Sequence, residues 1–371
     1  MSALCVAGAM DDVRIAAFTK YDREAASTRQ RVLQYLPALS EAGIHVDYHP
    51  LLGDDYVRGL ATGRKSSKAA IARAYWRRMT HLLRGPDYDA IWIYAELFPY
   101  LPAAFERLAF SRGKPVVYDT DDAFFLAYDD HRNAWVRRLL GGKLDALMAG
   151  AAACCCGNPY LRDHAARCCR RSIVLPTVVD TDIYAPSPAR GETRPLVIGW
   201  IGSPSTWPNV RPLLPLLGRL CRAHDLRFRA VGAGVGAERD RFDGLDLVEW
   251  SEAAEVAEVQ AMDIGIMPLD DLPFQRGKSG YKLVQYMACG LPVIASPVGV
   301  NCQIVVNGVT GHLATSEAEW NEALSRLIGD PALRARMGQA GRASAVENYS
   351  LSSQAPRLVE LFRSVVMTHD R

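Results

Sequence analysis

The chain has 371 residues, more than the roughly 250–300 that one hydrophobic core usually organises, so two domains are expected. Hydrophobic residues make up 49% and charged residues 23%, which excludes extensive disorder. Lys and Arg number 43 against 41 Asp and Glu, and this net charge of +2 gives no support to a nucleic-acid binder. No apolar run reaches the roughly 20 residues of a bilayer span. Because Asp11, Asp12 and Arg14 interrupt the apolar N-terminal stretch, we expect a cytoplasmic protein without a secretory signal.

Five of the nine cysteines are clustered, and none of the nine forms a CxxC pair. Cys154, Cys155 and Cys156 are consecutive, and Cys168 and Cys169 are adjacent. Neighbouring cysteines in an apolar setting favour buried free thiols in a reducing cytosol over disulfides. A metal site over 154–169 is the alternative, and we expect no metal.

Short apolar runs alternate with longer helical patterns in the first half of the chain, which is typical of parallel α/β architecture. Strands are predicted at Val13–Phe18, Val46–Tyr48, Ala90–Tyr94, Val116–Tyr118, Ala151–Cys156 and Ser172–Leu175. Apolar residues recur with helical spacing over Thr28–Ala42, and Gly43 follows as a stop signal, so one helix is predicted there.

A Pro-rich polar stretch, Tyr184–Pro195, interrupts this alternation and is typical of a linker. Strands are predicted again at Leu196–Ile201, Leu226–Val231, Leu245–Trp250, Ile264–Pro268 and Val293–Ala295. The sequence therefore predicts two α/β domains of similar size. The loop after the first strand carries no GxGxxG, so a simple dinucleotide-binding fingerprint is absent.

The loop Arg276–Gly280 leads from a buried strand into a helix that begins near Tyr281. Small residues at the start of a helix leave backbone N–H groups exposed, and the helix dipole favours an anion there. Lys278 and Lys282 lie four residues apart beside this point, which suits a diphosphate. A solvated loop with two surface lysines is the alternative that spacing leaves open.

Two segments of the second half resemble a known family: YMACGLPVIASPVGVNCQIVVNGVTGHL and DPALRARMGQAGRASAVENYSLSSQAPRLVELFRSV. They resemble the C-terminal domain and final helices of family-4 glycosyltransferases, retaining enzymes of the GT-B fold, and the likeness extends over Val197–Val366. It implies two Rossmann-like α/β domains that face each other across a cleft. Residues 1–190 would form the acceptor side and 191–350 the nucleotide-sugar side, with a helix over 351–371 crossing back onto the first domain.

The resemblance also implies an activity. It is the transfer of a sugar from a UDP- or GDP-linked donor to an acceptor hydroxyl with retention, without a cofactor. The diphosphate would leave on the same face, and its own oxygen would take the acceptor proton. The expected acceptor is a saccharide or lipid-linked saccharide in bacterial envelope polysaccharide or glycolipid synthesis. Two alternatives stay open: a GT-B nucleotide-sugar epimerase and a non-catalytic sugar-nucleotide-binding subunit.

This chain departs from the family at the donor ribose. Members of the family commonly hold the ribose with the second glutamate of a Glu-x7-Glu pair. Here Gln285 stands at that position and Gly277 at the first. Gln285 can still hydrogen-bond a hydroxyl, but only as a neutral group.

A second departure concerns the pyrophosphate. The family commonly supplies an Arg and a Lys after the first strand of this domain, where this chain has the loop Gly202–Thr206. The backbone of Gly202 and the hydroxyls of Ser203 and Thr206 offer neutral donors there, although a turn capped by Ser205 or Thr206 is an alternative. We therefore expect Lys278 and Lys282 to pair with the negative charge of the diphosphate.

In the first domain, the segment VVYDTDDAFF places Asp119, Asp121 and Asp122 at the end of a buried strand. Close carboxylates repel one another unless donors or cations pair with them. At the carboxyl end of a strand they are well placed to bind sugar hydroxyls, so we predict a catalytic site of these three and Lys278. The DTDD loop resembles a bacterial subgroup of the family. Helix capping by Asp119 or Asp121, and a divalent ion, are the alternatives.

Basic residues mark two further places. Arg29 and Arg31 follow the loop after the first strand, and we predict them at the mouth of the cleft, where they meet an acceptor or donor phosphate; a surface helix is the alternative. The stretch Arg58–Arg84 interleaves eight basic residues with aromatic ones and contains no acid. Such a stretch is typical of a segment that binds an anionic membrane surface, here the inner face of the cell membrane. A solvated helix with one buried face is the alternative.

Overall fold

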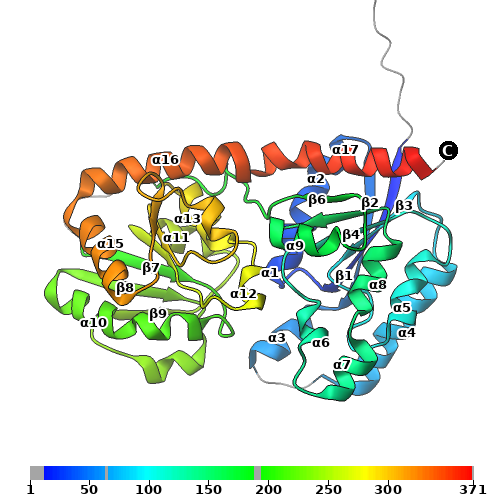
Figure 1. The fold of residues 1–371 in the computed structure, drawn as a ribbon, viewed down its shortest axis with the longest axis horizontal. Helices are drawn as coiled ribbons and strands as arrows, with labels where there is room; N and C mark the ends of the chain where they lie inside the picture. Colours follow the sequence, from blue (N-terminus) through cyan, green and yellow to red (C-terminus); the bar gives the residue numbers. More distant parts are fainter. Residues whose placement is uncertain (1–11, 63–65, 188–193, 370–371) are drawn as a thin grey trace, which may run out of the picture.

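The computed structural model describes residues 12–62, 66–187 and 194–369. Two six-stranded sheets with helices packed around them form two domains (Figure 1). Within the described residues, every pair of neighbouring strands in the two sheets runs parallel. The α/β class expected from the alternation of apolar runs is therefore confirmed.

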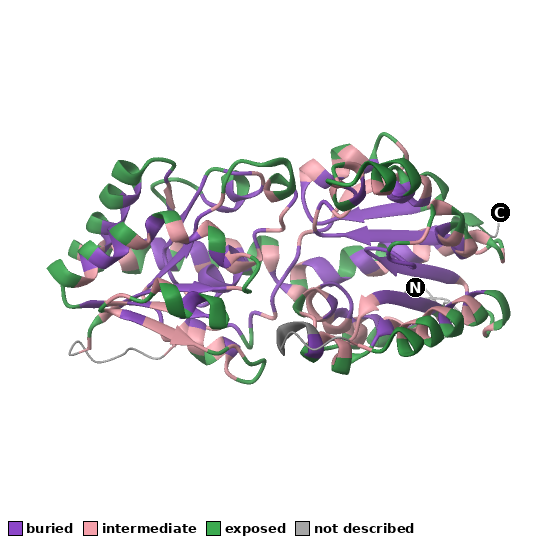
Figure 2. Ribbon diagram, turned by 90° about the horizontal axis from the view of Figure 1, so that it is seen from below, coloured by how far each residue is buried: buried purple, intermediate pink, exposed green. Residues whose placement is uncertain are grey.

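The first sheet has the order β2-β1-β3-β4-β5-β6. Its strands are β1 (Val13–Tyr21), β2 (Ile44–Leu52), β3 (Ala90–Tyr94), β4 (Val116–Thr120), β5 (Ala153–Cys156) and β6 (Ser172–Val174). Every residue of β3, β4 and β5 is buried, as expected for central parallel strands that are covered on both faces. The purple strands of Figure 2 show this layer between the greener helices.

The helices of the first domain are α1 (Ala26–Arg31), α2 (Leu36–Glu41), α3 (Asp54–Thr62), α4 (Lys68–Arg84), α5 (Ala103–Glu106), α6 (Leu126–Asp129), α7 (Ala134–Leu140), α8 (Lys143–Gly150) and α9 (Pro159–Ala165). The single helix predicted over 28–42 is wrong. Val32 leaves the helical conformation at φ −123°, a short 3-10 turn follows, and Pro37 stands in the first turn of a new helix, where its missing N–H costs nothing.

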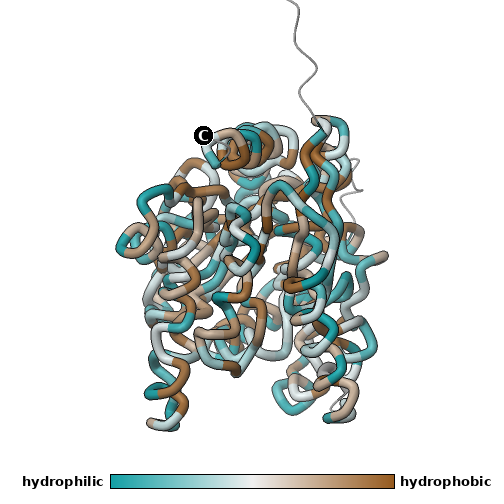
Figure 3. Tube along the Cα trace, turned by 90° about the vertical axis from the view of Figure 1, so that its right-hand side faces the viewer, coloured by the Kyte–Doolittle hydropathy of each residue, from teal (hydrophilic) through white to brown (hydrophobic). Residues whose placement is uncertain are grey.

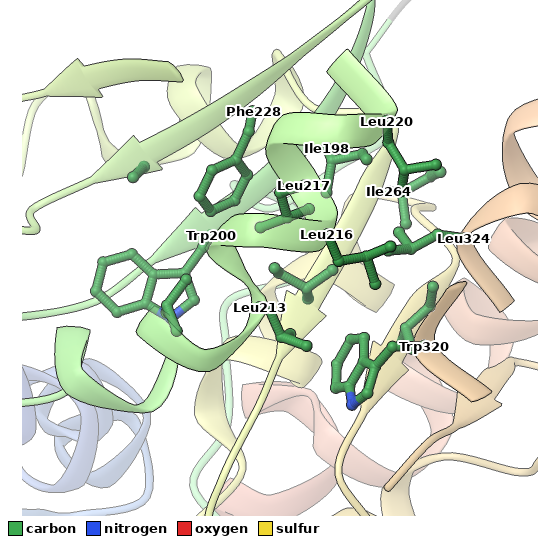
Figure 4. Close-up of a cluster of buried hydrophobic side chains, with 14 of the residues drawn as sticks. Ile198, Trp200, Leu213, Leu216, Leu217, Leu220, Phe228, Ile264, Trp320 and Leu324 are labelled. Carbon is green, nitrogen blue, oxygen red and sulfur yellow. The ribbon is translucent and has the colours of Figure 1, made fainter. Parts of the chain in front are cut away.

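The second sheet has the order β12-β11-β10-β7-β8-β9. Its strands are β7 (Leu196–Ile201), β8 (Leu226–Val231), β9 (Leu245–Val248), β10 (Ile264–Met267), β11 (Val293–Ala295) and β12 (Gly311–Leu313). The edge strand β12 was not predicted, because three residues are too few to show a period. Helices α10 (Leu214–Ala223), α11 (Glu255–Gln260), α12 (Pro273–Arg276), α13 (Tyr281–Ala288), α14 (Asn301–Ile304) and α15 (Glu317–Gly329) complete the domain. In its core, Trp200 and Phe228 pack with leucines of α10 and with Trp320 of α15 (Figure 4).

Two long helices, α16 (Pro331–Tyr349) and α17 (Leu351–His369), run along both domains (Figure 1). Helix α16 packs closely on α13: a Cβ at Gly338 would lie 2.0 Å from the carbonyl oxygen of Gly290. Helix α17 then crosses to the first domain, where Phe362 packs edge-on against Trp92 of β3 with ring centroids 5.2 Å apart. Figure 3 looks at the molecule from the side on which α17 ends and shows hydrophobic and hydrophilic positions around this helix.

The cysteines of the described residues are free, and Cys154, Cys155 and Cys156 form the buried strand β5. Cys5 lies outside the described residues. Within the described ranges, no group of three or more His, Cys, Asp or Glu side chains is arranged to hold a metal ion.

Candidate functional site

The topology of both sheets points to one region. The first sheet reverses its strand order between β1 and β3, and the second between β7 and β10. In parallel α/β sheets, ligands bind beyond the carboxyl ends of the strands at such a reversal. Contacts between the two domains join segments that follow their strands: Arg23, after β1, pairs with Glu252, after β9, and Asp122, after β4, lies near Lys278, after β10.

Asn158 joins the two domains at this boundary. Its side-chain nitrogen donates to the carbonyl oxygens of Gly277 at 2.8 Å and Lys278 at 2.9 Å. Its side-chain oxygen accepts from the backbone N–H of Leu161 at 2.9 Å and caps α9. The backbones approach closely here, because a Cβ at Gly277 would lie 2.6 Å from that of Ala123. Any side chain at Gly277 would therefore push the domains apart.

Asp119 and Arg31 form a fully buried ion pair. The Nε and Nη2 groups of Arg31 donate to Asp119 Oδ1 at 2.9 and 2.7 Å, and Nη1 donates to the carbonyl oxygen of Leu175 at 2.8 Å. Burial raises the pKa of Asp119 to about 6, against the pull of Arg31. Burial lowers the pKa of Arg31, but Asp119 outweighs it and the pKa is raised overall. The predicted position of Arg31 at the cleft mouth is wrong: both side chains are inaccessible and tie α1 to β4.

Asp121 and Asp122 follow Asp119 but have different surroundings. Tyr94 donates its hydroxyl to Asp121 Oδ1 at 2.5 Å, and Asp121 is 6% exposed. Asp122 is more open, with 29% of its side chain exposed, and its Oδ1 lies 3.9 Å from Lys278 Nζ of the second domain. Burial raises the pKa of Asp122 to about 7, with Lys278 opposing and Asp121 adding to the shift. The DTDD loop thus places the Asp119 carboxylate in the core and the Asp122 carboxylate beside the second domain.

Lys278 and Lys282 flank the N-terminus of α13, and both act on Asp122. Gly280 is the N-cap, with φ +67° and no capping side chain. This left-handed conformation favours glycine here, and a Cβ would also have to displace the end of the Ile304 side chain, 2.4 Å away. Burial lowers the pKa of Lys282 to about 8, and the nearby charge of Lys278 adds to the shift while Asp122 opposes it. Two ammonium groups and the positive end of a helix thus meet opposite Asp122.

The loop after β7 forms a turn closed by its own hydroxyls. The hydroxyl of Thr206 accepts from the backbone N–H of Ser203 at 3.1 Å and donates to its carbonyl oxygen at 3.0 Å. Gly202 must be glycine, because a Cβ there would lie 2.4 Å from the Trp200 ring. Ser203 and Ser205 are exposed, with their hydroxyl oxygens 2.9 Å apart. The side chain of Thr206 is therefore engaged within the turn, while Ser203 faces solvent.

Gln285 belongs to a buried polar network that the sequence did not reveal. Its amide nitrogen donates to Glu255 Oε1 at 2.7 Å and to the Tyr184 hydroxyl at 3.1 Å, and Gln285 is 3% exposed. Glu255 also accepts from Trp250 Nε1 at 2.6 Å. No sequence signal could have found this carboxylate, because it reaches Gln285 from 30 residues away through the fold.

Arg29 lies at the domain boundary, where it contacts the loop that follows β9. Its guanidinium lies 5.0 Å from the centre of the Trp250 ring, and its Nε is 3.8 Å from Glu252 Oε1. Arg23 donates to the same carboxylate oxygen at 2.8 Å. We refer to Arg23, Arg29, Trp250 and Glu252 as the latch. Arg29, unlike Arg31, thus lies between the two domains.

The predicted basic stretch Arg58–Arg84 covers two helices. Arg58 lies on α3, where it pairs with Glu24 and Asp55, and Arg64 and Lys65 lie outside the described residues. On α4, Lys68, Arg73, Arg77 and Arg84 are exposed. Arg78 does not belong to this face: it is 4% exposed and donates to the carbonyl oxygens of Leu97, Thr19 and His49.

Comparison with known proteins finds a partial match to one family model and to several curated relatives. Residues 195–330 match the family model described as "Glycosyl transferases group 1". The alpha-maltose-1-phosphate synthase of Mycobacterium tuberculosis is 32% identical over 90 residues, covering 22% of this chain and 23% of that protein. The GDP-mannose-dependent alpha-(1-6)-phosphatidylinositol monomannoside mannosyltransferase of Mycolicibacterium smegmatis is 27% identical over 220 residues, covering 50% of this chain and 55% of that protein. This chain therefore spans about a quarter to a half of these curated relatives.

Solved structures match the whole architecture. Sucrose-phosphate synthase from Thermosynechococcus elongatus superposes with a TM-score of 0.71 at 15% identity, covering 96% of this chain and 100% of that one. Anabaena HepE in complex with UDP-glucose superposes with a TM-score of 0.67 at 15% identity, covering 95% and 100%. The chain has the GT-B fold predicted from its sequence, and residues 195–330 of its second domain are similar to group 1 glycosyl transferases.

Proposed function

We propose that this chain is a retaining glycosyltransferase that moves a sugar from a UDP- or GDP-linked donor to an acceptor hydroxyl. The group 1 glycosyl transferase sequence of the second domain and the GT-B fold support this assignment. That Anabaena HepE, of the same fold, is described with UDP-glucose supports a nucleotide-sugar donor. The epimerase and the non-catalytic subunit are the alternatives that the test below separates.

The observation that carries the proposal is the charge arrangement around α13. Lys278, Lys282 and the first-turn N–H groups of α13 gather positive charge at the reversal point of the second sheet. A diphosphate leaving group develops negative charge as the sugar departs, and fixed donors that face this charge stabilise the transition state. We assign the diphosphate to this place, with the exposed Ser203 and the backbone of Gly202 as neutral contacts.

The first domain supplies the residues that we assign to the acceptor. Asp122 faces the two lysines, and Asp121 is held by Tyr94 behind it. We assign Asp121 and Asp122 to the hydroxyls of the transferred sugar or the acceptor, with Asp119 holding the loop from the core. As the bond between the sugar and the diphosphate breaks, the acceptor oxygen bonds to the same carbon of the sugar, and a diphosphate oxygen takes the proton of the acceptor hydroxyl. Lys278 and Lys282 stabilise the negative charge of the departing diphosphate. No cofactor enters this scheme.

Calorimetry with UDP and GDP tests the diphosphate site. One charge-assisted contact contributes about 1.5–3 kcal/mol, so Lys278→Ala is expected to weaken diphosphate binding about tenfold or more. Lys282→Ala should do the same, whereas Arg276→Ala, at the end of α12 two residues before Lys278 and paired with Asp271, serves as a matched control that keeps wild-type affinity. Wild-type affinity in both lysine variants would overturn the site.

Product analysis separates the three classes of function. Incubation with radiolabelled UDP-glucose or GDP-mannose and a bacterial envelope extract should yield free nucleoside diphosphate and labelled glycan. An epimer of the donor formed without acceptor would identify an epimerase. Binding of the donor without any turnover would identify the non-catalytic subunit.

We further propose that the acceptor is a lipid-linked saccharide of the bacterial envelope and that the protein meets an anionic membrane through α4. The exposed Lys68, Arg73, Arg77 and Arg84 support this, because each basic residue near such a surface contributes about 1 kcal/mol. Among the described residues, no helix has the length and apolar character needed to cross a membrane.

A further inference from the structure

Five charged side chains gather at the carboxyl ends of β1 and β3, the reversal point of the first sheet. Buried Lys143 places its Nζ 3.1 Å from Glu96 Oε2 and 3.0 Å from Glu106 Oε1. Lys20, at the end of β1, places its Nζ 3.1 Å from Glu96 Oε1. Arg78 is buried as well and donates to the backbone carbonyl directly before Lys20 at 2.7 Å. The group thus carries three positive and two negative charges.

Lys20 is the member of this group that solvent reaches, with 27% of its side chain exposed. Burial would raise the pKa of Glu96, but Lys20, Lys143 and the Tyr128 hydroxyl outweigh it, so the pKa is lowered and the carboxylate stays ionised. Without Lys20 the remaining charges would balance. Among the described residues, the hydrogen-bond acceptor of its ammonium group is Glu96 Oε1 alone. Lys20 therefore keeps two N–H donors and the surplus positive charge for an anion from outside.

An exposed aromatic ring lies beside Lys20. It belongs to Tyr100, which is 66% exposed. Burial lowers the pKa of Lys20, whereas Glu96 and the neighbouring Tyr100 are among the groups that raise it. The backbone of Tyr100 has φ +57°, which is strained for a residue with a side chain. The Tyr128 hydroxyl holds it there, because it accepts from the Tyr100 N–H at 3.0 Å and donates to Glu96 Oε2 at 2.6 Å. Such maintained strain is concentrated at binding and active sites.

The loop that carries this ring is hydrogen-bonded to the DTDD loop. Ala95, which also has a positive φ of 67°, donates its N–H to the carbonyl oxygen of Asp119 at 2.9 Å. Tyr94, directly before it, donates its hydroxyl to Asp121. Lys20 and the exposed ring therefore lie at the same edge of the first sheet as the carboxylates that we assign to sugar hydroxyls.

We propose that Lys20 and Tyr100 bind the acceptor and that the acceptor is a saccharide with an anionic substituent. One face of the sugar packs on the ring of Tyr100, and a phosphate or carboxylate of the same molecule pairs with Lys20. A neutral sugar would cover the surplus charge of Lys20 without giving it a partner. The inference rests on the proposed function for the role of this saccharide as acceptor, and it adds the chemical class of that acceptor.

NMR saturation-transfer titrations of the full chain with glucose, glucose 6-phosphate and glucuronate test this subsite. Excess UDP in every sample fills the diphosphate site at Lys278 and Lys282, so that the anionic sugars do not bind there. We expect the wild type to bind both anionic sugars about tenfold more tightly than glucose, because they add a charge-assisted contact. Lys20→Gln keeps a donor for Glu96 but has no charge and should remove this preference. Lys20→Arg keeps the charge and should retain it.

Tyr100→Ala removes the ring at an exposed position and should weaken the binding of all three sugars by roughly twofold to tenfold. Trp135→Ala is the matched control, because Trp135 is another exposed aromatic residue of the first domain, 70% exposed, and lies on α7. It should bind the sugars as the wild type does. The melting temperatures of all variants check that they fold.

Equal affinity of the wild type for the three sugars, a preference that survives in Lys20→Gln, or wild-type affinity in Tyr100→Ala would overturn the proposal. Inorganic phosphate that binds as tightly as glucose 6-phosphate would show an anion site without a saccharide, which also overturns it. Tighter binding of glucose 6-phosphate than of glucuronate supports a phosphate substituent, and the reverse order supports a carboxylate. UDP affinity, measured by calorimetry without any sugar, reports on the proposed function separately.

Discussion

The buried pair of Arg31 and Asp119 is the residue-level contact with the clearest thermodynamic consequence. Arg31→Met leaves the Asp119 carboxylate without its guanidinium, and we expect the free energy of unfolding at pH 8 to fall by about 3–5 kcal/mol. The pKa of Asp119, raised to about 6 in the wild type, should rise further in the variant. Stability gained from a raised folded-state pKa is present below the unfolded value and lost as pH rises through the folded one. The deficit of the variant should therefore be smaller at pH 5 than at pH 8, as measured by urea unfolding.

The double variant Arg31→Met/Asp119→Asn serves as its control. It has no carboxylate at position 119 to ionise, so its deficit relative to the wild type should not grow from pH 5 to pH 8 as that of Arg31→Met does. If Arg31→Met alone shows the same deficit at pH 5 and pH 8, its cost comes from lost packing rather than from a stranded charge.

Lys282 gives the second residue-level prediction, a pH dependence of donor binding. Its pKa is lowered to about 8 by burial and by Lys278, so the free protein loses this proton as pH rises above 8. A diphosphate binds the protonated form, and its affinity should fall by up to about tenfold per pH unit above that value. Calorimetry of UDP between pH 7 and 9.5 measures the profile. Lys282→Arg keeps its charge throughout, and a profile identical to the wild type would contradict the role of Lys282.

Residue-level prediction from the sequence worked where the partners are local. Spacing alone placed Lys278 and Lys282 beside one helix end, and the structure brings both near Asp122. Arg31 and Asp119 lie 88 residues apart, and nothing in either segment distinguishes a core arginine from an exposed one. The Glu255 network with Gln285 was hidden for the same reason. Long-range polar pairs require the fold.

At the scale of elements, Asn158 combines two tasks that substitution can separate. Its oxygen caps α9, and its nitrogen joins the first domain to the carbonyl oxygens of Gly277 and Lys278. Asn158→Asp keeps the cap but has no donor, whereas Asn158→Ala loses both, including about 1 kcal/mol of capping. We expect both variants to weaken UDP binding, because Lys278 is no longer held, with only Asn158→Ala losing the cap. Wild-type UDP affinity in Asn158→Asp would reduce Asn158 to a helix cap.

The boundaries of the strands and helices show how much of the secondary structure hydrophobic periodicity can predict. The buried strands β3 and β7 have the bounds predicted from their apolar runs, Ala90–Tyr94 and Leu196–Ile201. The break in the helix over 28–42 was missed because its apolar positions keep one spacing through the break at Val32. Continuous hydrophobic spacing does not require a continuous helix.

At the scale of the whole molecule, the feature to test is the relative placement of the two domains. The latch is an exposed contact between them. Glu252 has 45% of its side chain exposed, so Glu252→Ala should change stability by less than about 1 kcal/mol. Loss of its contacts with Arg23 and Arg29 should nevertheless let the domains separate more often. Small-angle X-ray scattering is expected to show a larger radius of gyration than for Glu249→Ala, an exposed change on the same loop. An unchanged radius would mean that Asn158 and the two long helices set the arrangement without the latch.

The crossing of α17 onto the first domain has a consequence for synthesis. The first sheet begins with Val13, but Leu358 and Phe362 of α17 cover its β3 strand at Trp92. A ribosome therefore translates the whole second domain before the first can close its core. Until then, the apolar face of the first sheet that α17 covers stays accessible to chaperones and proteases. A truncated chain that ends after α16 would leave this face uncovered permanently.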